Sequence, residues 1–194
     1  MGMPEVIKRW TRDEVLALPD DGNRYELIEG ELLVSPAPRG SHQRAVLTLY
    51  RVVDPYVRSH GLGYTGLAPA DLDFRTGEVA QPDLYVVGLV EGREPVEWSE
   101  QGVPFLIAEV LSPSTARYDR TIKRRFFQRR GVVDYWIVDN DARLVEHWHP
   151  ADDRPAILDR RLEWAPDIGL PPLVIDLPAY FRQVWAEPER ADPR

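Results

Sequence analysis

The chain has 194 residues, 43% of them hydrophobic and 29% charged, and its formal net charge is -8. This length suits one domain with a full-sized core. The negative charge excludes a protein that binds nucleic acid over its whole surface, so any such contact must be local. The absence of cysteine excludes disulfides, thiolate nucleophiles and cysteine-ligated metal sites.

The first segment, MGMPEVIKRW, has no apolar core of the kind found in signal peptides, and no stretch is apolar enough to span a bilayer. We therefore expect a cytoplasmic protein with no membrane contact. We also expect one folded domain over residues 8–185, with flexible termini at 1–7 and 186–194.

The first predicted elements are a short helix and a hairpin. Thr11 and Glu14 match a capping box, in which each residue bonds the backbone of the other at the start of a helix. The sequence RYELIEGELLVS, residues 24–35, reads as two strands about a Glu-Gly turn and predicts a β-hairpin.

A longer helix and a second hairpin are expected next. Ser41 is expected to cap an amphipathic helix that runs towards Gly61. Residues 70–74 (ADLDF) and 79–87 (VAQPDLYVV) flank a polar Arg-Thr-Gly-Glu turn and predict two paired strands.

The second half of the sequence predicts further buried strands and helices. A buried strand is expected at residues 105–111, followed by a helix at 118–130 that a glycine ends. A hairpin is expected at 133–150, and a docked segment with a terminal helix at 173–185. Strands interrupted by helices in this order predict an α/β fold with a mixed β-sheet, as one domain.

Two carboxylates stand where a charge is costly. Glu109 lies inside the apolar run FLIAEVL, and Asp83 follows Pro82 and opens the apolar run LYVV. If these strands are neighbours, both carboxylates meet at one end of the sheet, where a divalent cation can compensate them. Ligation by oxygen alone favours Mg²⁺, with Mn²⁺ as a substitute, over zinc.

Lys123 is unusual because the chain has only one other lysine, Lys8, and 22 arginines. It follows Ile122 at the edge of an apolar helical stripe, from which its ammonium can point inward. Beside a metal, such a point charge suits the stabilisation of a transition state or the orientation of a water.

These residues resemble a known nuclease motif. Pro82-Asp83 followed by Glu109-Val110-Leu111 resembles PD-(D/E)XK, and YELIEGEL, SHQR, QPDL, EVLSPST, DRTIK and DYWIVD resemble the Uma-type family of putative restriction endonucleases, over residues 25–139. The resemblance implies a restriction-endonuclease-like mixed sheet flanked by helices, with Asp83 and Glu109 binding Mg²⁺ and DNA as the nucleic-acid substrate.

The sequence departs from the motif at its third position. Leu111 stands where a nuclease of this class carries lysine, and Phe127 stands where the family has a tyrosine. The resemblance implies that Lys123, on the following helix, replaces the missing lysine.

Three further candidates come from the resemblance. Glu26 in YELI, Glu31 in GEL and His42 at the helix start match family positions. From the residues alone, Glu26 is either a third carboxylate of the site or a surface residue, and which of Glu26 and Glu31 reaches the site stays open. His42 is either a proton carrier or a helix-start residue.

Each residue also has a structural interpretation. Asp83 and Glu109 can belong to an ion network that holds no metal, and Lys123 can decorate a solvated basic helix or contact phosphates with its arginine neighbours. Asp119, one turn earlier, is expected to pair with Lys123 or the helix N-terminus. His147 and His149 share a strand face, but with no third histidine or cysteine nearby we expect an exposed hairpin.

The sequence therefore predicts a metal-dependent endonuclease in which Asp83, Glu109, Lys123, Glu26 and His42 are the site residues. A homodimer is expected, because it would bring two basic helices to one nucleic acid. The alternative is a catalytically inactive, homodimeric binding module with the nuclease fold, and a paired-carboxylate glycosidase ranks last.

Overall fold

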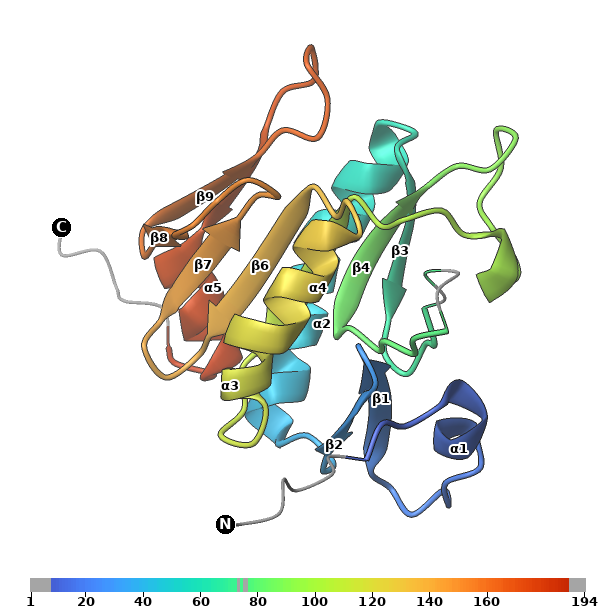
Figure 1. Cartoon of the computed structure of the whole chain (residues 1–194). Helices are drawn as coiled ribbons and strands as arrows, with labels where there is room; N and C mark the ends of the chain where they lie inside the picture. The colour runs from blue at the N-terminus through green and yellow to red at the C-terminus, as the bar shows by residue number, and fades with distance from the viewer. Residues whose placement is uncertain (1–7, 73, 75–76, 189–194) are drawn as a thin grey trace, which may run out of the picture.

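A six-stranded mixed sheet forms the centre of the fold in the computed structural model, which describes residues 8–72, 74 and 77–188 (Figure 1). Its strand order is β3-β4-β5-β6-β7-β8. In chain order the strands are β3 (Gly63–Leu67), β4 (Leu84–Gly88), β5 (Leu106–Val110), β6 (Asp134–Asp139), β7 (Leu144–Trp148) and β8 (Ala156–Leu158). Only β5 and β6 pair in parallel, so the predicted mixed α/β sheet is confirmed.

Two small antiparallel sheets and several helices surround this centre. The small sheets pair β1 (Arg24–Ile28) with β2 (Glu31–Ser35), and β9 (Arg161–Trp164) with β10 (Leu173–Asp176). The helical elements are α1 (Arg12–Leu16), α2 (Gly40–Ser59), the 3₁₀ turn η1 (Trp98–Glu100), α3 (Ala116–Tyr118), the π-helical turn η2 (Asp119–Lys123), α4 (Arg124–Arg129) and α5 (Leu177–Val184). No helix among the described residues is both long and apolar enough to cross a membrane.

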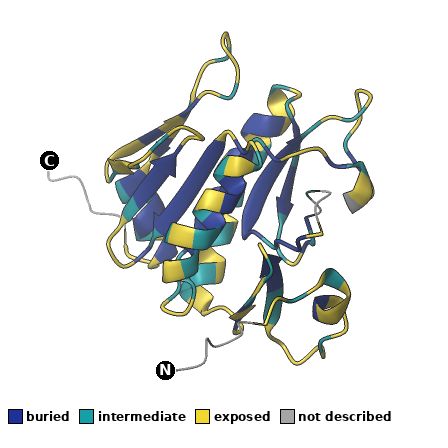
Figure 2. Ribbon diagram, in the orientation of Figure 1, coloured by how far each residue is buried: buried dark blue, intermediate teal, exposed yellow. Residues whose placement is uncertain are grey.

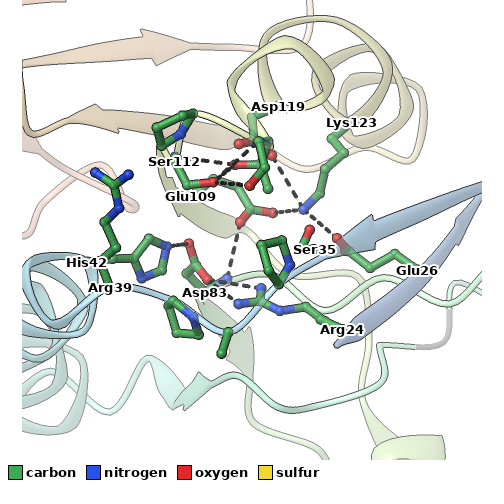
Figure 3. A pocket seen from close by; sticks show the side chains of 16 residues that line it. Arg24, Glu26, Ser35, Arg39, His42, Asp83, Glu109, Ser112, Asp119 and Lys123 are labelled. Carbon is green, nitrogen blue, oxygen red and sulfur yellow. Dashed lines mark hydrogen bonds and ion pairs between the residues drawn. The ribbon is translucent and has the colours of Figure 1, made fainter. Parts of the chain in front are cut away.

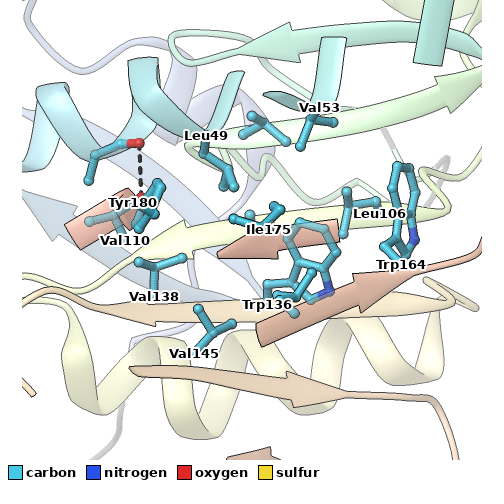
Figure 4. Close-up of a cluster of buried hydrophobic side chains, with 14 of the residues drawn as sticks. Leu49, Val53, Leu106, Val110, Trp136, Val138, Val145, Trp164, Ile175 and Tyr180 are labelled. Carbon is cyan, nitrogen blue, oxygen red and sulfur yellow. Dashed lines mark hydrogen bonds between the residues drawn. The ribbon is translucent and has the colours of Figure 1, made fainter. Parts of the chain in front are cut away.

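The sheet has a packed core on each face, as the buried strands in Figure 2 indicate. Alternate side chains of each strand point to opposite faces. On β6, Trp136 and Val138 pack with α2, α5, β9 and β10 (Figure 4), whereas Tyr135 and Ile137 pack with α4 and with the hairpin β1–β2. Both faces are thus covered, and a charged side chain on a central strand is cut off from bulk water.

Several local predictions agree with the structure. The capping box of Thr11 and Glu14 is present, and residues 24–35 form the expected hairpin. The helix at 118–130 is confirmed, but its centre is a π turn, a geometry that is rare and often found at functional sites. Gly131 follows α4 with φ 82°, as expected for the residue after a helix.

Two local predictions are wrong. Ser41 does not cap α2, because the helix begins at Gly40 and its N-cap, Arg39, makes no side-chain capping bond. The second hairpin is replaced by β3 and β4, and the described residues just before Gly77 contribute one isolated bridge, between Leu72 and Ala80. Residues 75–76 of the turn predicted at 75–78 lie outside the described residues. The same holds for the expected flexible termini at 1–7 and 186–194, apart from residues 186–188.

Candidate active site

Asp83 and Glu109 lie opposite each other on neighbouring strands (Figure 3). Leu84 of β4 pairs with Ala108 of β5 in an antiparallel register, which sets Asp83, one residue before β4, across from Glu109. The backbone N–H of Asp83 donates to Glu109 Oε2 over 3.3 Å, and that of Val110 donates to Asp83 Oδ2 over 2.9 Å. The fold therefore brings two buried carboxylates to one point of the sheet.

Asp83 is held by two side chains, Arg24 and His42. Arg24 Nη1 and Nη2 each lie 3.0 Å from Oδ1, and His42 Nε2 lies 3.0 Å from Oδ2. Burial opposes ionisation of Asp83, but the contacts from His42 and Arg24 outweigh it and lower its pKa to about 2. Asp83 is therefore an anion at neutral pH.

Lys123 compensates Glu109. Its Nζ lies 2.6 Å from Glu109 Oε1, 3.0 Å from Glu26 Oε2 and 3.6 Å from Asp119 Oδ1. The residue is only 2% exposed, and burial alone would lower the pKa of the ammonium, but the surrounding carboxylates raise it above its ordinary value. The π turn η2 places Asp119 and Lys123 on the side of the helix that faces the sheet.

The site holds more negative than positive groups. Four buried carboxylates, those of Glu26, Asp83, Glu109 and Asp119, surround Lys123 and Arg24, so that four negative and two positive charges leave two negative charges in excess. Burial, with repulsion from the neighbouring carboxylates, raises the pKa of Glu109 well above 4.5 and that of Asp119 to about 6. The surplus is thus met either by protons or by an added cation.

A cavity of about 260 Å³ opens onto this cluster. All the charged residues above line it, together with His42 and the exposed Arg39. Arg39 and His42 belong to the N-terminus of α2, where backbone N–H groups lack a side-chain cap. A helix N-terminus attracts anions, so this side of the cavity favours a phosphate.

The donor set fits a hard divalent cation. The carboxylates offer oxygen ligands of the type that Mg²⁺ and Mn²⁺ prefer, and two surplus charges match such an ion. Glu109 Oε1 is buried and, apart from its ion pair with Lys123, has no hydrogen-bond partner. Asp83 is less free, because Arg24, His42 and a backbone N–H occupy both its oxygens, so a metal would displace one of these side chains.

Most of the chain matches one family model. Residues 12–177 match the model of the Uma2 family, described as "Putative restriction endonuclease". The chain belongs to the Uma2 family. Among solved structures, it is similar to a "putative nuclease belonging to DUF820" from Anabaena variabilis, with 21% identity and a TM-score of 0.65, over 90% of this chain and 99% of that chain. This likeness supports the fold, and no curated protein matches the chain.

The Uma2 chain brings together all five residues named as site candidates from the sequence. Glu26 and not Glu31 reaches the cluster, since Glu31 is exposed on β2. Leu111 is outside the lining of the 260 Å³ cavity, and Phe127 is fully buried in the core, so neither stands at the cavity edge.

Two members of the Uma2 site were not among these candidates. Arg24 could have been suspected because it lies two residues before Glu26 and so shares a strand face with it. Asp119 was expected only to pair structurally; it does contact Lys123, and it also lines the cavity.

The basic helix α4 of the Uma2 chain is largely paired within the protein. Arg124 lies 4.4 Å above the ring of Trp148 and bonds Gln128, Arg129 pairs with Glu29, and Arg130 pairs with Glu78. These contacts favour a structural role for this helix over direct contact with phosphates.

Proposed function

We propose that the chain is a Mg²⁺-dependent endonuclease that hydrolyses phosphodiester bonds in DNA. The observation that carries the proposal is the convergence of Asp83, just before β4, Glu109 of β5 and Lys123 of η2 at one cavity. These groups suit metal-assisted phosphodiester hydrolysis, with two carboxylates for a metal and a cation for the developing charge.

Asp83 and Glu109 would hold the metal. A bound Mg²⁺ would supply a water of lowered pKa and polarise the scissile phosphate. Lys123 would stabilise the negative charge that develops on the phosphate, or orient the attacking water. Glu26 and Asp119 hold the ammonium in position from two sides, over 3.0 Å and 3.6 Å.

Arg24 and His42 would act at the phosphate. Both contact Asp83 and both line the cavity, so they would lie beside a metal held by Asp83 and beside a phosphate bound to it. Arginine suits this role because its planar guanidinium binds two phosphate oxygens at once. The uncapped N-terminus of α2 adds backbone donors on the same side.

DNA is proposed as the substrate from the family description, "Putative restriction endonuclease". With a net charge of -8, one chain would bind a polyanion weakly and in a salt-sensitive way. A homodimer would place two cavities on one duplex and raise the effective affinity without any new contact. We include this assembly and a cytoplasmic location in the proposal.

A second candidate function is an inactive, homodimeric binding module. It is favoured by one observation, that the charges of Asp83 and Glu109 already have partners in Arg24, His42 and Lys123. A site satisfied in this way can persist as a structural ion network.

The two candidates differ in metal binding, which calorimetry measures directly. We expect the wild type to bind Mn²⁺ or Mg²⁺ and to cleave supercoiled plasmid, with EDTA stopping cleavage. Asp83→Asn, which keeps the side-chain shape, should lose both properties. Glu31→Gln is the matched control, because Glu31 is an exposed family-matching glutamate outside the cluster.

The outcomes separate the candidates. Metal binding that disappears in Asp83→Asn, together with metal-dependent cleavage, supports the nuclease. A folded wild type that binds neither ion at millimolar concentration rules the nuclease out and supports the module. Single-stranded DNA and RNA of the same sequence, tested beside the plasmid, decide the substrate class.

A further inference from the structure

A second group of potential ligands lies where β6 begins and β7 ends. Tyr135 of β6 pairs with Trp148 of β7, so the same register sets Asp134 across from His149. His147 precedes His149 by two residues and therefore points to the same face. One donor atom from each of Asp134, His147 and His149 lies within 4.8 Å of the others.

One oxygen of Asp134 faces both imidazoles. Oδ1 lies 2.6 Å from His147 Nε2 and 3.5 Å from His149 Nε2, while Oδ2 accepts a 3.0 Å hydrogen bond from the indole of Trp164. The indole fixes the carboxylate from behind and leaves Oδ1 to the histidines. Asp134 and His147 are buried, whereas the side chain of His149 is 51% exposed.

Asp152 fixes the orientation of His149. Its Oδ2 accepts the backbone N–H of His149 over 2.7 Å and lies 3.1 Å from the ring Nδ1. An ionised carboxylate only accepts, so Nδ1 carries a hydrogen that points to Asp152. This orientation turns Nε2 of His149 towards Asp134 Oδ1, which His147 Nε2 also faces, so the three potential ligand atoms gather in one place.

We propose that Asp134, His147 and His149 form a Zn²⁺ site, with Asp152 as the carboxylate that orients His149. Two imidazoles and one carboxylate form a three-ligand set of the type zinc uses when its fourth position stays open to solvent or a ligand. The exposed side of His149 supplies that opening. A carboxylate behind a ligating histidine is the usual support for such a site.

The spacing of the donors fits this ion after a small adjustment. Tetrahedral zinc bonds of about 2.0–2.1 Å place two donors roughly 3.3 Å apart. The distance of 3.5 Å between Asp134 and His149 agrees with this value, and the 2.6 Å contact of His147 must open. That contact is a hydrogen bond, so zinc would replace its proton.

This site is separate from the nuclease cluster. Asp134 pairs with Leu106 of β5, three residues from Glu109, or roughly 10 Å along the strand. Asp134 shares a face with Trp136, which packs with α2 and α5, whereas Glu109 shares the opposite face with Ile107. A metal at one site therefore does not require a metal at the other.

The expectation of an exposed hairpin is confirmed for His149, whose side chain is 51% exposed, and is wrong for His147. His147 is 8% exposed, and the missing third ligand comes from the neighbouring strand as a carboxylate. The third ligand therefore does not have to be a histidine or a cysteine. The sequence alone does not reveal which residue lies across from His149.

The test is Zn²⁺ titration of the full chain, followed by calorimetry and by long-range ¹H–¹⁵N spectra of the imidazoles. The chain has four histidines, so each ring can be followed separately. We expect one Zn²⁺ per chain and a change at Nε2 of His147 and His149 but not at His60. His149→Ala should abolish this binding, and Asp152→Asn should weaken it by roughly 10- to 100-fold.

His60→Ala is the matched control, because His60 lies at the end of α2, outside the cluster, and should leave binding unchanged. His149 is half exposed, so its variant should fold, and an unchanged melting curve without metal checks this. The proposal is overturned if the wild type binds no Zn²⁺ at micromolar concentration, or if binding survives His149→Ala. Asp83→Asn should retain the zinc signal, which keeps this result independent of the nuclease proposal.

Discussion

The ammonium of Lys123 lies 2.6 Å from Glu109 Oε1, and the two residues come from a π turn and from the central strand β5. In the PD-(D/E)XK motif that this sequence resembles, the lysine belongs to the same strand as the glutamate. Here the pair links a helix to the sheet beneath it. Each of the two buried charges therefore finds its partner only where the helix packs against the sheet.

Removing Lys123 should destabilise the fold. Lys123→Met keeps the unbranched stem but leaves Glu26 and Glu109 without their cation, and breaking a buried pair in this way costs about 3–5 kcal/mol. Urea denaturation measures the change in the free energy of unfolding. Lys8→Met is the control: Lys8 pairs with Glu14 at a side-chain exposure of 56% and should cost at most about 1 kcal/mol. Equal losses in both variants would contradict a buried ion network.

Metal affinity should rise with pH. Burial and neighbouring carboxylates raise the pKa of Glu109 well above 4.5, so at acidic pH a proton competes with the metal, and the competition ends as the pH passes the folded pKa. Asp83, with a pKa of about 2, stays ionised over this range and adds no such dependence.

Calorimetry of Mn²⁺ binding in two buffers with different ionisation enthalpies measures the protons released. The stability of the metal-free protein should depend on pH in the opposite direction to metal affinity. The pKa of Glu109 is higher in the folded than in the unfolded state, so Glu109 favours folding at low pH, and this contribution is lost as the pH rises through the folded pKa. A metal affinity that is independent of pH, with no proton release, would show that Glu109 is already ionised.

Glu26 and Glu31 should differ in their effect on cleavage. Glu26→Gln removes a charge that holds Lys123 over 3.0 Å, whereas Glu31 is exposed on the partner strand. We expect plasmid cleavage to fall by roughly 10- to 100-fold in Glu26→Gln, as for the loss of a supporting group in other sites, and to be unchanged in Glu31→Gln. Comparable rates for both variants would remove Glu26 from the site.

Gly66 should not tolerate a side chain. A Cβ at this position of β3 would overlap the ring of the fully buried Tyr85 on β4. We expect Gly66→Ala to lower the free energy of unfolding by about 1–3 kcal/mol, the usual cost of overpacking. Gly88→Ala on β4 is the control, since a Cβ there meets no atom within 4 Å. Thermal unfolding of both variants compares them, and equal melting temperatures would contradict the packing of β3 on β4.

Much of the fold could be predicted because local signals agreed with it. The Glu-Gly turn fixed the first hairpin, and the apolar runs around Asp83 and Glu109 marked buried strands. The strand β3 was not foreseen because two of its five residues, Gly63 and Gly66, are glycine, which is depleted in strands.

The parts of the site that were missed depend on tertiary pairing. Arg24 reaches Asp83 because the hairpin β1–β2 packs against the sheet; its spacing to Glu26 indicates a shared strand face but not that Asp83 is its partner. In the same way, Asp134 meets His147 only through the register of β6 and β7. Spacing along the sequence can identify side chains that lie together on one helix or strand. Each of these two pairs instead joins side chains from two different elements.

The contact between Lys123 and Glu26 spans 97 positions of sequence and so closes half of the 194-residue chain into one loop. Loops of this length close late, because their entropy cost precedes any gain from the contact. The charged groups at the cavity therefore meet only after the first hairpin, the sheet and the helix have docked. A partly folded chain would carry every one of these residues and yet have no site, which confines any cleavage of nucleic acid to molecules that have finished folding.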